Sequence, residues 1–172
     1  YWDNAEILNV GAVTWVNGAT GRPMGSSKPN VAVNTLNSLH GLSDGDRVGF
    51  NGVVPLTNGN YVVVSPFWRQ GAVFNAGAVT WVNGLTALPI GGSVVGTAVS
   101  TANSVYGTNS GNGFMGDEGY SLLNFVVNPL ENGNYVIRYP YWDNESIADV
   151  GAVMWADRSE EHTSELQSLT NL

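Results

Sequence analysis

Short apolar runs, separated by turns rich in Gly and Asn, fill most of this 172-residue chain. Runs of this length bounded by turn residues are typical of β-strands and do not support long amphipathic helices. In the centre of the chain the pattern predicts four strands, at residues 47–56, 61–67, 77–83 and 102–107. Asn58-Gly59 lies between the first two, and it predicts an antiparallel hairpin because both residues tolerate positive φ.

The third predicted strand has two distinct faces. Successive side chains of a strand point to opposite sides of the sheet. Ala78, Thr80 and Val82 would therefore share one face, and Val79 and Trp81 the other. We expect the face that carries the Trp to lie in the core.

The same sequence blocks return along the chain. Residues 11–18, Gly-Ala-Val-Thr-Trp-Val-Asn-Gly, recur unchanged at 77–84 and in altered form at 151–155. A second block, residues 56–62, recurs at 130–136 with one change, Thr57 to Glu131. The blocks predict a partial first repeat at 1–46, a complete central repeat at 47–107 and a partial third repeat at 108–157.

A unit of four antiparallel strands cannot cover both of its faces alone and has to pack on neighbouring units. We therefore predict an all-β repeat protein whose antiparallel, four-stranded, blade-like units form part of a β-propeller. A β-solenoid is the alternative, although its coils usually repeat over roughly 20 to 30 residues. The distance from Trp15 to Trp81 is 66 residues. A closed propeller needs roughly four to eight blades, so we expect this chain to be a fragment with exposed ends.

The net charge and the absence of Cys exclude several classes of partner and site. The formal net charge of -8 argues against nucleic acid and against an anionic membrane surface, which both need clustered Lys and Arg. The chain has no Cys, so it can form neither a disulfide framework nor a thiolate metal site. No apolar stretch approaches the ~20 residues of a membrane span, and we expect no membrane insertion in this segment. The expected partners are neighbouring repeats of the same chain.

The composition changes abruptly at Arg158. Residues 158–168, Arg-Ser-Glu-Glu-His-Thr-Ser-Glu-Leu-Gln-Ser, have no counterpart in the repeats. This string resembles the translation of a sequencing-library adapter, which implies that residues 158–172 are a non-native tail without function. The alternative is a genuine acidic tail.

The central repeat carries a family resemblance in residues 45–53, 56–68 and 76–81. These blocks resemble repeats of unknown function in very large bacterial surface proteins, many of which look like filamentous-haemagglutinin-type adhesins. Their order is also similar to the FG-GAP blade of integrin-like propellers. The resemblance implies a secreted or cell-surface location, with surface glycans or host cell-surface proteins as further candidate partners.

The FG-GAP resemblance raises the question of calcium. Such blades often bind calcium through a loop of alternating carboxylates, because a hard cation needs several oxygen ligands. The corresponding loops here are residues 56–60 and 130–134, and their one acidic residue is Glu131. Calcium is therefore disfavoured, and we expect no other cofactor and no metal site. Asp44-Gly45-Asp46 and Asp117-Glu118 are interpreted as turn residues.

The aromatic residues fall into repeat-locked classes. Trp2, Trp68 and Trp142 form one Trp class, whereas Trp15, Trp81 and Trp155 form the other. We assign the second class, with Tyr61 and Tyr135, to the structural core of the repeat. The first class follows a Pro near a strand end where loops begin, and it supplies the candidate residues for stacking on glycans.

No catalytic motif stands out. Nucleophile elbows, phosphate-binding loops and His-rich metal motifs do not occur, and we predict that the chain is not an enzyme. His40 aligns with Tyr106, and we interpret both as a surface or edge aromatic position. Paired carboxylates for glycoside cleavage remain formally open among Asp3, Glu6, Asp143, Glu145 and Asp149.

Three functions follow from this sequence. The first is a non-catalytic structural or adhesive repeat segment of a large secreted or cell-surface bacterial protein. The second is a glycan-binding β-propeller module. The third is a fragment of a propeller enzyme whose catalytic residues lie outside this chain.

Overall fold

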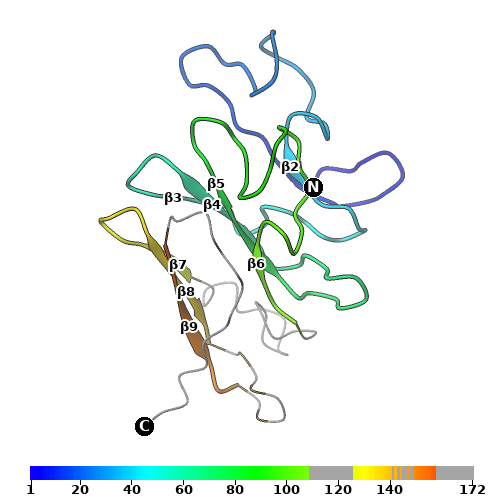
Figure 1. Cartoon of the computed structure of the whole chain (residues 1–172). Helices are drawn as coiled ribbons and strands as arrows, with labels where there is room; N and C mark the ends of the chain where they lie inside the picture. The colour runs from blue at the N-terminus through cyan, green and yellow to red at the C-terminus, as the bar shows by residue number, and fades with distance from the viewer. Residues whose placement is uncertain (109–125, 141, 143, 145–146, 148, 158–172) are drawn as a thin grey trace.

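The computed structural model describes residues 1–108, 126–140, 142, 144, 147 and 149–157 (Figure 1). This part of the chain contains no helix and folds into antiparallel sheets of two, four and three strands, with no closed barrel. The all-β, blade-like architecture that the pattern predicts is therefore confirmed. The strands are β1 (Ala12–Val13), β2 (Leu39–His40), β3 (Val53–Pro55), β4 (Tyr61–Ser65), β5 (Ala78–Val82), β6 (Val105–Tyr106), β7 (Val126–Pro129), β8 (Tyr135–Tyr139) and β9 (Ala152–Ala156).

The central sheet has the strand order β3-β4-β5-β6, so each strand pairs with the next along the chain. The first predicted strand, 47–56, is wrong in length, because only Val53–Pro55 is extended. Arg47, Gly49 and Gly52 all have positive φ, which interrupts an extended backbone before β3. The other three predicted strands are present, and each is shorter than predicted.

The β3-β4 hairpin forms around the predicted turn, with Val54 opposite Val62. Of the turn pair, only Gly59 has positive φ, at 85°. The Leu56 N–H donates to the Asn60 carbonyl at 2.8 Å and closes the loop. A glycine in the left-handed region after a turn is the usual way to close a loop of this length.

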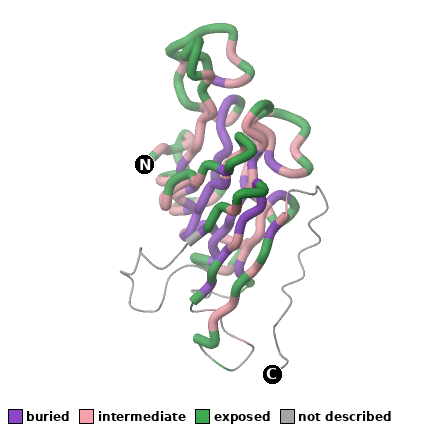
Figure 2. Tube along the Cα trace, turned by 90° about the vertical axis from the view of Figure 1, so that its left-hand side faces the viewer, coloured by how far each residue is buried: buried purple, intermediate pink, exposed green. Residues whose placement is uncertain are grey.

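Both faces of the central sheet are buried. One side, named here the tyrosine face, is formed by Tyr61, Val63, Ala78 and Val82. The same name is used for the equivalent positions in the other repeats. The opposite side, named the tryptophan face, is formed by Val62, Val64, Val79 and Trp81, and again the name covers the equivalent positions in the other repeats. Figure 2 shows the buried positions running through the middle of the molecule. The expectation that the core lies on the Trp side is thus correct for half of the core only.

The flanking sheets cover these two faces. Val13 of β1 and Leu39 of β2 contact the tyrosine face. On the opposite side, Tyr135, Ile137 and Tyr139 of β8 contact the tryptophan face. Fully burying one aliphatic side chain stabilises a fold by roughly 1.5–3 kcal/mol. Each neighbouring sheet therefore contributes to the stability of the central sheet by burying one of its faces.

Candidate functional site

The three glycan-candidate Trp residues differ in exposure, and the central one is buried. Trp68 is 5% exposed, and its ring meets the Tyr106 ring edge-on with centroids 6.2 Å apart. Trp2 is half-buried, and Trp142 packs against the cluster between β4-β5 and β8-β9. A sugar ring stacks on an accessible aromatic face, so Trp68 cannot serve as a stacking platform in this structure. The backbone explains the repeat: the Trp carbonyl accepts an N–H from Gly11, Gly77 or Gly151 in the three copies.

The other Trp class, assigned to the core, is placed unevenly. Trp81 is half-buried against the core between the central and third sheets. Trp15 is also half-buried, whereas Trp155 is 56% exposed. The assignment to a core therefore fits Trp81 best and does not hold for Trp155 in this chain.

Tyr61 and Tyr135 occupy the same position on the tyrosine face of successive sheets. Tyr61 packs on the core shared with the first sheet, and Tyr135 is fully buried between the central and third sheets. Burial raises the pKa of Tyr61 to about 12. Burial also raises the pKa of Tyr135 far above its usual range, helped by the nearby Asp157 carboxylate. These environments fit the structural role that the sequence assigns to both residues.

The two loops at the calcium position contact each other. The Thr57 hydroxyl lies 3.2 Å from the Leu130 carbonyl and 3.1 Å from the Glu131 carbonyl. The Asn58 side-chain amide donates to the Gly133 carbonyl at 3.3 Å. The hairpin turns thus join the central and third sheets.

Three amide side-chain oxygens of these loops, those of Asn58, Asn60 and Asn132, accept backbone N–H groups. Asn58 Oδ1 accepts the Asn60 N–H at 3.1 Å, and Asn60 Oδ1 accepts the Gly84 N–H at 3.0 Å. In the third repeat, Asn132 Oδ1 accepts the Asn134 N–H at 3.1 Å. The amide oxygens therefore shape the turns. In the described ranges, no group of three or more His, Cys, Asp or Glu side chains could hold a metal ion.

Asp46 is a buried carboxylate used by the backbone. Its Oδ2 accepts the N–H groups of Leu42 and Ser43, and its Oδ1 accepts that of Arg69 at 3.1 Å. Burial raises the pKa of Asp46, although the three N–H donors and the Arg69 charge oppose this. The carboxylate ties the loop at 42–46 to the segment after Trp68. This is the turn role that the sequence favours for Asp44-Gly45-Asp46, whereas Asp117-Glu118 lies outside the described residues.

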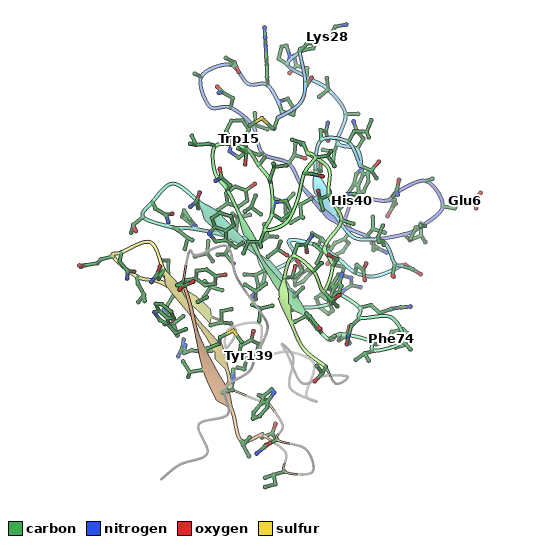
Figure 3. All side chains as sticks on the ribbon, viewed as in Figure 1. Glu6, Trp15, Lys28, His40, Phe74 and Tyr139 are labelled. Carbon is green, nitrogen blue, oxygen red and sulfur yellow. The ribbon has the colours of Figure 1, made fainter. Side chains whose placement is uncertain are left out.

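His40 corrects a prediction from the sequence. It is 6% exposed and is therefore not a surface position, whereas its strand, β2, is an edge strand of the first sheet, as the alternative edge position requires (Figure 3). Its Nδ1 lies 3.0 Å from the Ser38 carbonyl. Its own carbonyl accepts the Val99 N–H at 3.0 Å, which links the first repeat to the last part of the second. The residue is a structural link between repeats.

The candidate carboxylates are not gathered by the described part of the fold. Asp3 Oδ1 accepts the Asn9 N–H at 2.6 Å and closes its own loop. Glu6 is exposed at the tip of that loop and points away from the molecule (Figure 3). Asp149 lies in the third repeat, whereas Asp143 and Glu145 lie outside the described residues. Asp3 and Glu6 therefore do not face an enclosed site.

A buried polar network that the sequence pattern did not predict is present in two repeats. The Thr80 hydroxyl lies 2.7 Å from the Ser104 hydroxyl, which donates to Asn103 Oδ1 at 2.9 Å. Asn103 in turn donates to the Ala98 carbonyl and accepts the Ser100 N–H, both at 2.8 Å. Thr14, Ser38 and Asn37 repeat the arrangement in the first unit. The signal was the shared Asn-Ser pair at 37–38 and 103–104, which matches at the same offset as the two Thr residues.

A second missed feature is an arginine held between aromatic rings. The Arg47 guanidinium lies 5.0 Å from the Tyr1 ring centroid and 4.7 Å from the Phe67 centroid. Phe50 packs edge-on against Phe67, at 4.8 Å, and stacks on Tyr1 at 5.9 Å. Tyr1 and Phe67 hold the same position in successive repeats. This cluster therefore fastens the start of the first repeat to that of the second through cation–π contacts.

The candidate functional surface is thus the pair of sheet faces. Both described interfaces place the tryptophan face of one repeat on the tyrosine face of the next. Val13, at the position of Val79, contacts the central tyrosine face, and the central tryptophan face contacts Ile137, at the position of Val63. A contact between two different surfaces can be continued from unit to unit.

These observations define a class, an all-β repeat protein whose units stack face to face. The chain belongs to the family described as Repeat of unknown function (DUF5650), whose model matches residues 1–50, 55–115 and 129–170. The third matched range extends into the segment that the sequence assigns to a non-native tail. No curated protein and no solved structure matches the chain. The described residues contain no helix long and apolar enough to cross a membrane.

Proposed function

We propose that this chain is a non-catalytic scaffold segment of a large secreted or cell-surface bacterial protein, built from stacked, propeller-like repeats. The observation that carries the proposal is the central sheet, which is buried on both faces by sheets of neighbouring repeats. A unit of this kind contributes by holding its neighbours in a fixed arrangement. Adhesion would then come from loops displayed many times along the array.

The polar groups support a structural role. The carboxylate of Asp46 and the side-chain oxygens of Asn58, Asn60 and Asn132 bind backbone N–H groups. The Thr-Ser-Asn network is internal and occurs in two units. Residues used in this way hold the loops in place and are not free to act on a substrate.

Hydrogen exchange of the purified chain tests the scaffold role. Because the sheets share two apolar interfaces, the slowest amides of β4, β5 and β8 should exchange with one common free energy of opening. Three different values would indicate independent modules and contradict a rigid scaffold. The same protein should neither be retained by nor cleave a panel of polysaccharides. Retention would favour the glycan-binding module, and cleavage the enzyme fragment.

A further inference from the structure

The third sheet leaves its tryptophan face open in the part of the chain that the structure describes. Val153 and Trp155 are 58% and 56% exposed, although the matching Val79 of the central sheet is 1% exposed. Trp155 stands opposite Val136, as Trp81 stands opposite Val62. The open surface therefore has the same strand register as the surface that the central sheet uses to bind the third.

The turn beside this face is also preset for a contact. Asn132 Oδ1 accepts the Asn134 N–H at 3.1 Å, as Asn58 Oδ1 accepts the Asn60 N–H at 3.1 Å. The side-chain amide of Asn58 donates across the interface to Gly133. Because Asn132 has the same local bond and is exposed, its amide group can reach a carbonyl of a following unit.

We infer that the face formed by Asn128, Val136, Arg138, Val153 and Trp155 is a docking surface for a further repeat of the same family, which would present its tyrosine face. The reason is continuity, because both described interfaces join these same two faces in the same order. The occupant is thus an apolar sheet face carrying a Tyr, an aliphatic residue and small Ala side chains.

Two positions on this face are polar, whereas the equivalent positions of the central sheet are aliphatic. Arg138 stands at the position of Val64, and Asn128 at that of Val54. The chain already holds one arginine, Arg47, against the rings of Tyr1 and Phe67. Arg138 would stack in the same way on an aromatic ring of the docking repeat. The inference rests on the proposed scaffold function and specifies the surface that extends it.

The test extends the full chain with its own sequence. Ala156 holds the position of Val82, so residues 1–156 can be followed by a second copy of 83–157. The appended copy supplies a tyrosine face through its own Tyr135, Ile137 and Tyr139. The matched control is the same extension with Ile137→Lys in the appended copy only, which places an unpaired charge at the centre of its tyrosine face and should prevent docking.

The readout is the solvent exposure of Trp155, followed by ¹⁹F NMR of protein labelled with 5-fluorotryptophan. Trp155→Phe in either copy assigns the two resonances. We expect the solvent isotope shift of the first Trp155 to fall on extension to that of Trp81, which is half-buried in the equivalent interface, whereas that of the appended Trp155 persists as an internal reference. In the Ile137→Lys control both residues should stay exposed.

A first Trp155 that stays exposed in the extended protein overturns the inference. So does an appended unit whose amides remain unprotected in hydrogen exchange, because docking should fold it. This outcome is separate from that of the proposed function. Polysaccharide binding or cleavage with a buried Trp155 would reject the scaffold role and leave the docking surface intact.

Discussion

The Thr80 hydroxyl lies 2.7 Å from the Ser104 hydroxyl, inside a sheet face that is buried by the first repeat. The equivalent Thr14 and Ser38 hydroxyls are 2.6 Å apart. A buried hydroxyl without a partner costs more than the hydrogen bond itself contributes, so each pair has to be complete. The pairs join the strand that carries the Trp to the segment that closes its repeat, 24 residues later.

The Thr80–Ser104 pair should be measurable as a coupling energy. Thr80→Val keeps the shape of a fully buried side chain and removes its hydroxyl, which should lower the free energy of unfolding by about 1–2 kcal/mol. Ser104→Ala should lower the free energy of unfolding by less in the Thr80→Val protein than in the parent chain. The difference, the coupling energy of the double-mutant cycle, should be about 1 kcal/mol. Urea unfolding of the four proteins gives the values. Purely additive costs would contradict the network.

Gly84 and Gly18 form a matched pair of substitutions at one repeat position. A Cβ at Gly84 would collide with the Gly59 carbonyl oxygen, whereas a Cβ at Gly18 meets no atom within 4 Å. Gly84→Ala should therefore destabilise the chain by about 1–3 kcal/mol, as overpacking typically does. Gly18→Ala should change stability by less than about 0.5 kcal/mol. Equal effects in thermal unfolding would show that the hairpin turn does not lie against Gly84.

The Trp residues should differ in their contribution to stability. Trp68→Ala empties a buried site beside Tyr106 and should cost about 3–5 kcal/mol. This is a large part of the roughly 5–15 kcal/mol that holds most domains together. Trp155→Ala changes an exposed side chain and should cost less than about 1 kcal/mol.

Denaturant titrations of the two Trp variants provide the measurement, and Trp68→Phe serves as the milder variant if Trp68→Ala does not fold. A stable Trp68→Ala protein would place that ring at the surface and would revive its candidacy for glycan binding.

High pH should unfold this protein through its tyrosines. Burial raises the pKa of Tyr61 from 10.0 to about 12, and it raises those of Tyr135 and Tyr139 further. A pKa that is higher in the folded state gives stability that is complete below pH 10 and is lost as the pH rises towards 12. Absorbance of tyrosinate should therefore rise in two steps, first from exposed residues and then together with the loss of structure.

Replacing Tyr135 with Phe provides the control for this titration. The variant should lose part of the second absorbance step and resist alkaline unfolding better than the parent chain. A single step near pH 10, with the fold intact, would mean that all tyrosines are accessible.

The hairpin was predictable because Asn58-Gly59 is a local signal that acts over a few residues. The length of β3 was overestimated: Gly49 and Gly52 were a signal that the strand is interrupted, whereas the positive φ at Arg47 has no reliable signature in the sequence. The burial of His40 was not predicted, because its alignment with Tyr106 gives the position in the repeat and not the exposure of the side chain. The Thr-Ser-Asn network could have been found from the offset it shares in two repeats, but a Ser or Asn near a turn is usually exposed.

What the sequence determined by itself is the unit: its repeats, its short strands, its hairpin and the alternation that divides each strand into two faces. These properties depend on local backbone preferences and on the side-chain period of two. Only the tertiary structure decided that both faces are buried, and that the tryptophan face of one repeat covers the tyrosine face of the next. Burial depends on what a neighbouring unit brings to the surface. For this reason the same position of the repeat is occupied by a buried Val79 in the central sheet and by an exposed Val153 in the third.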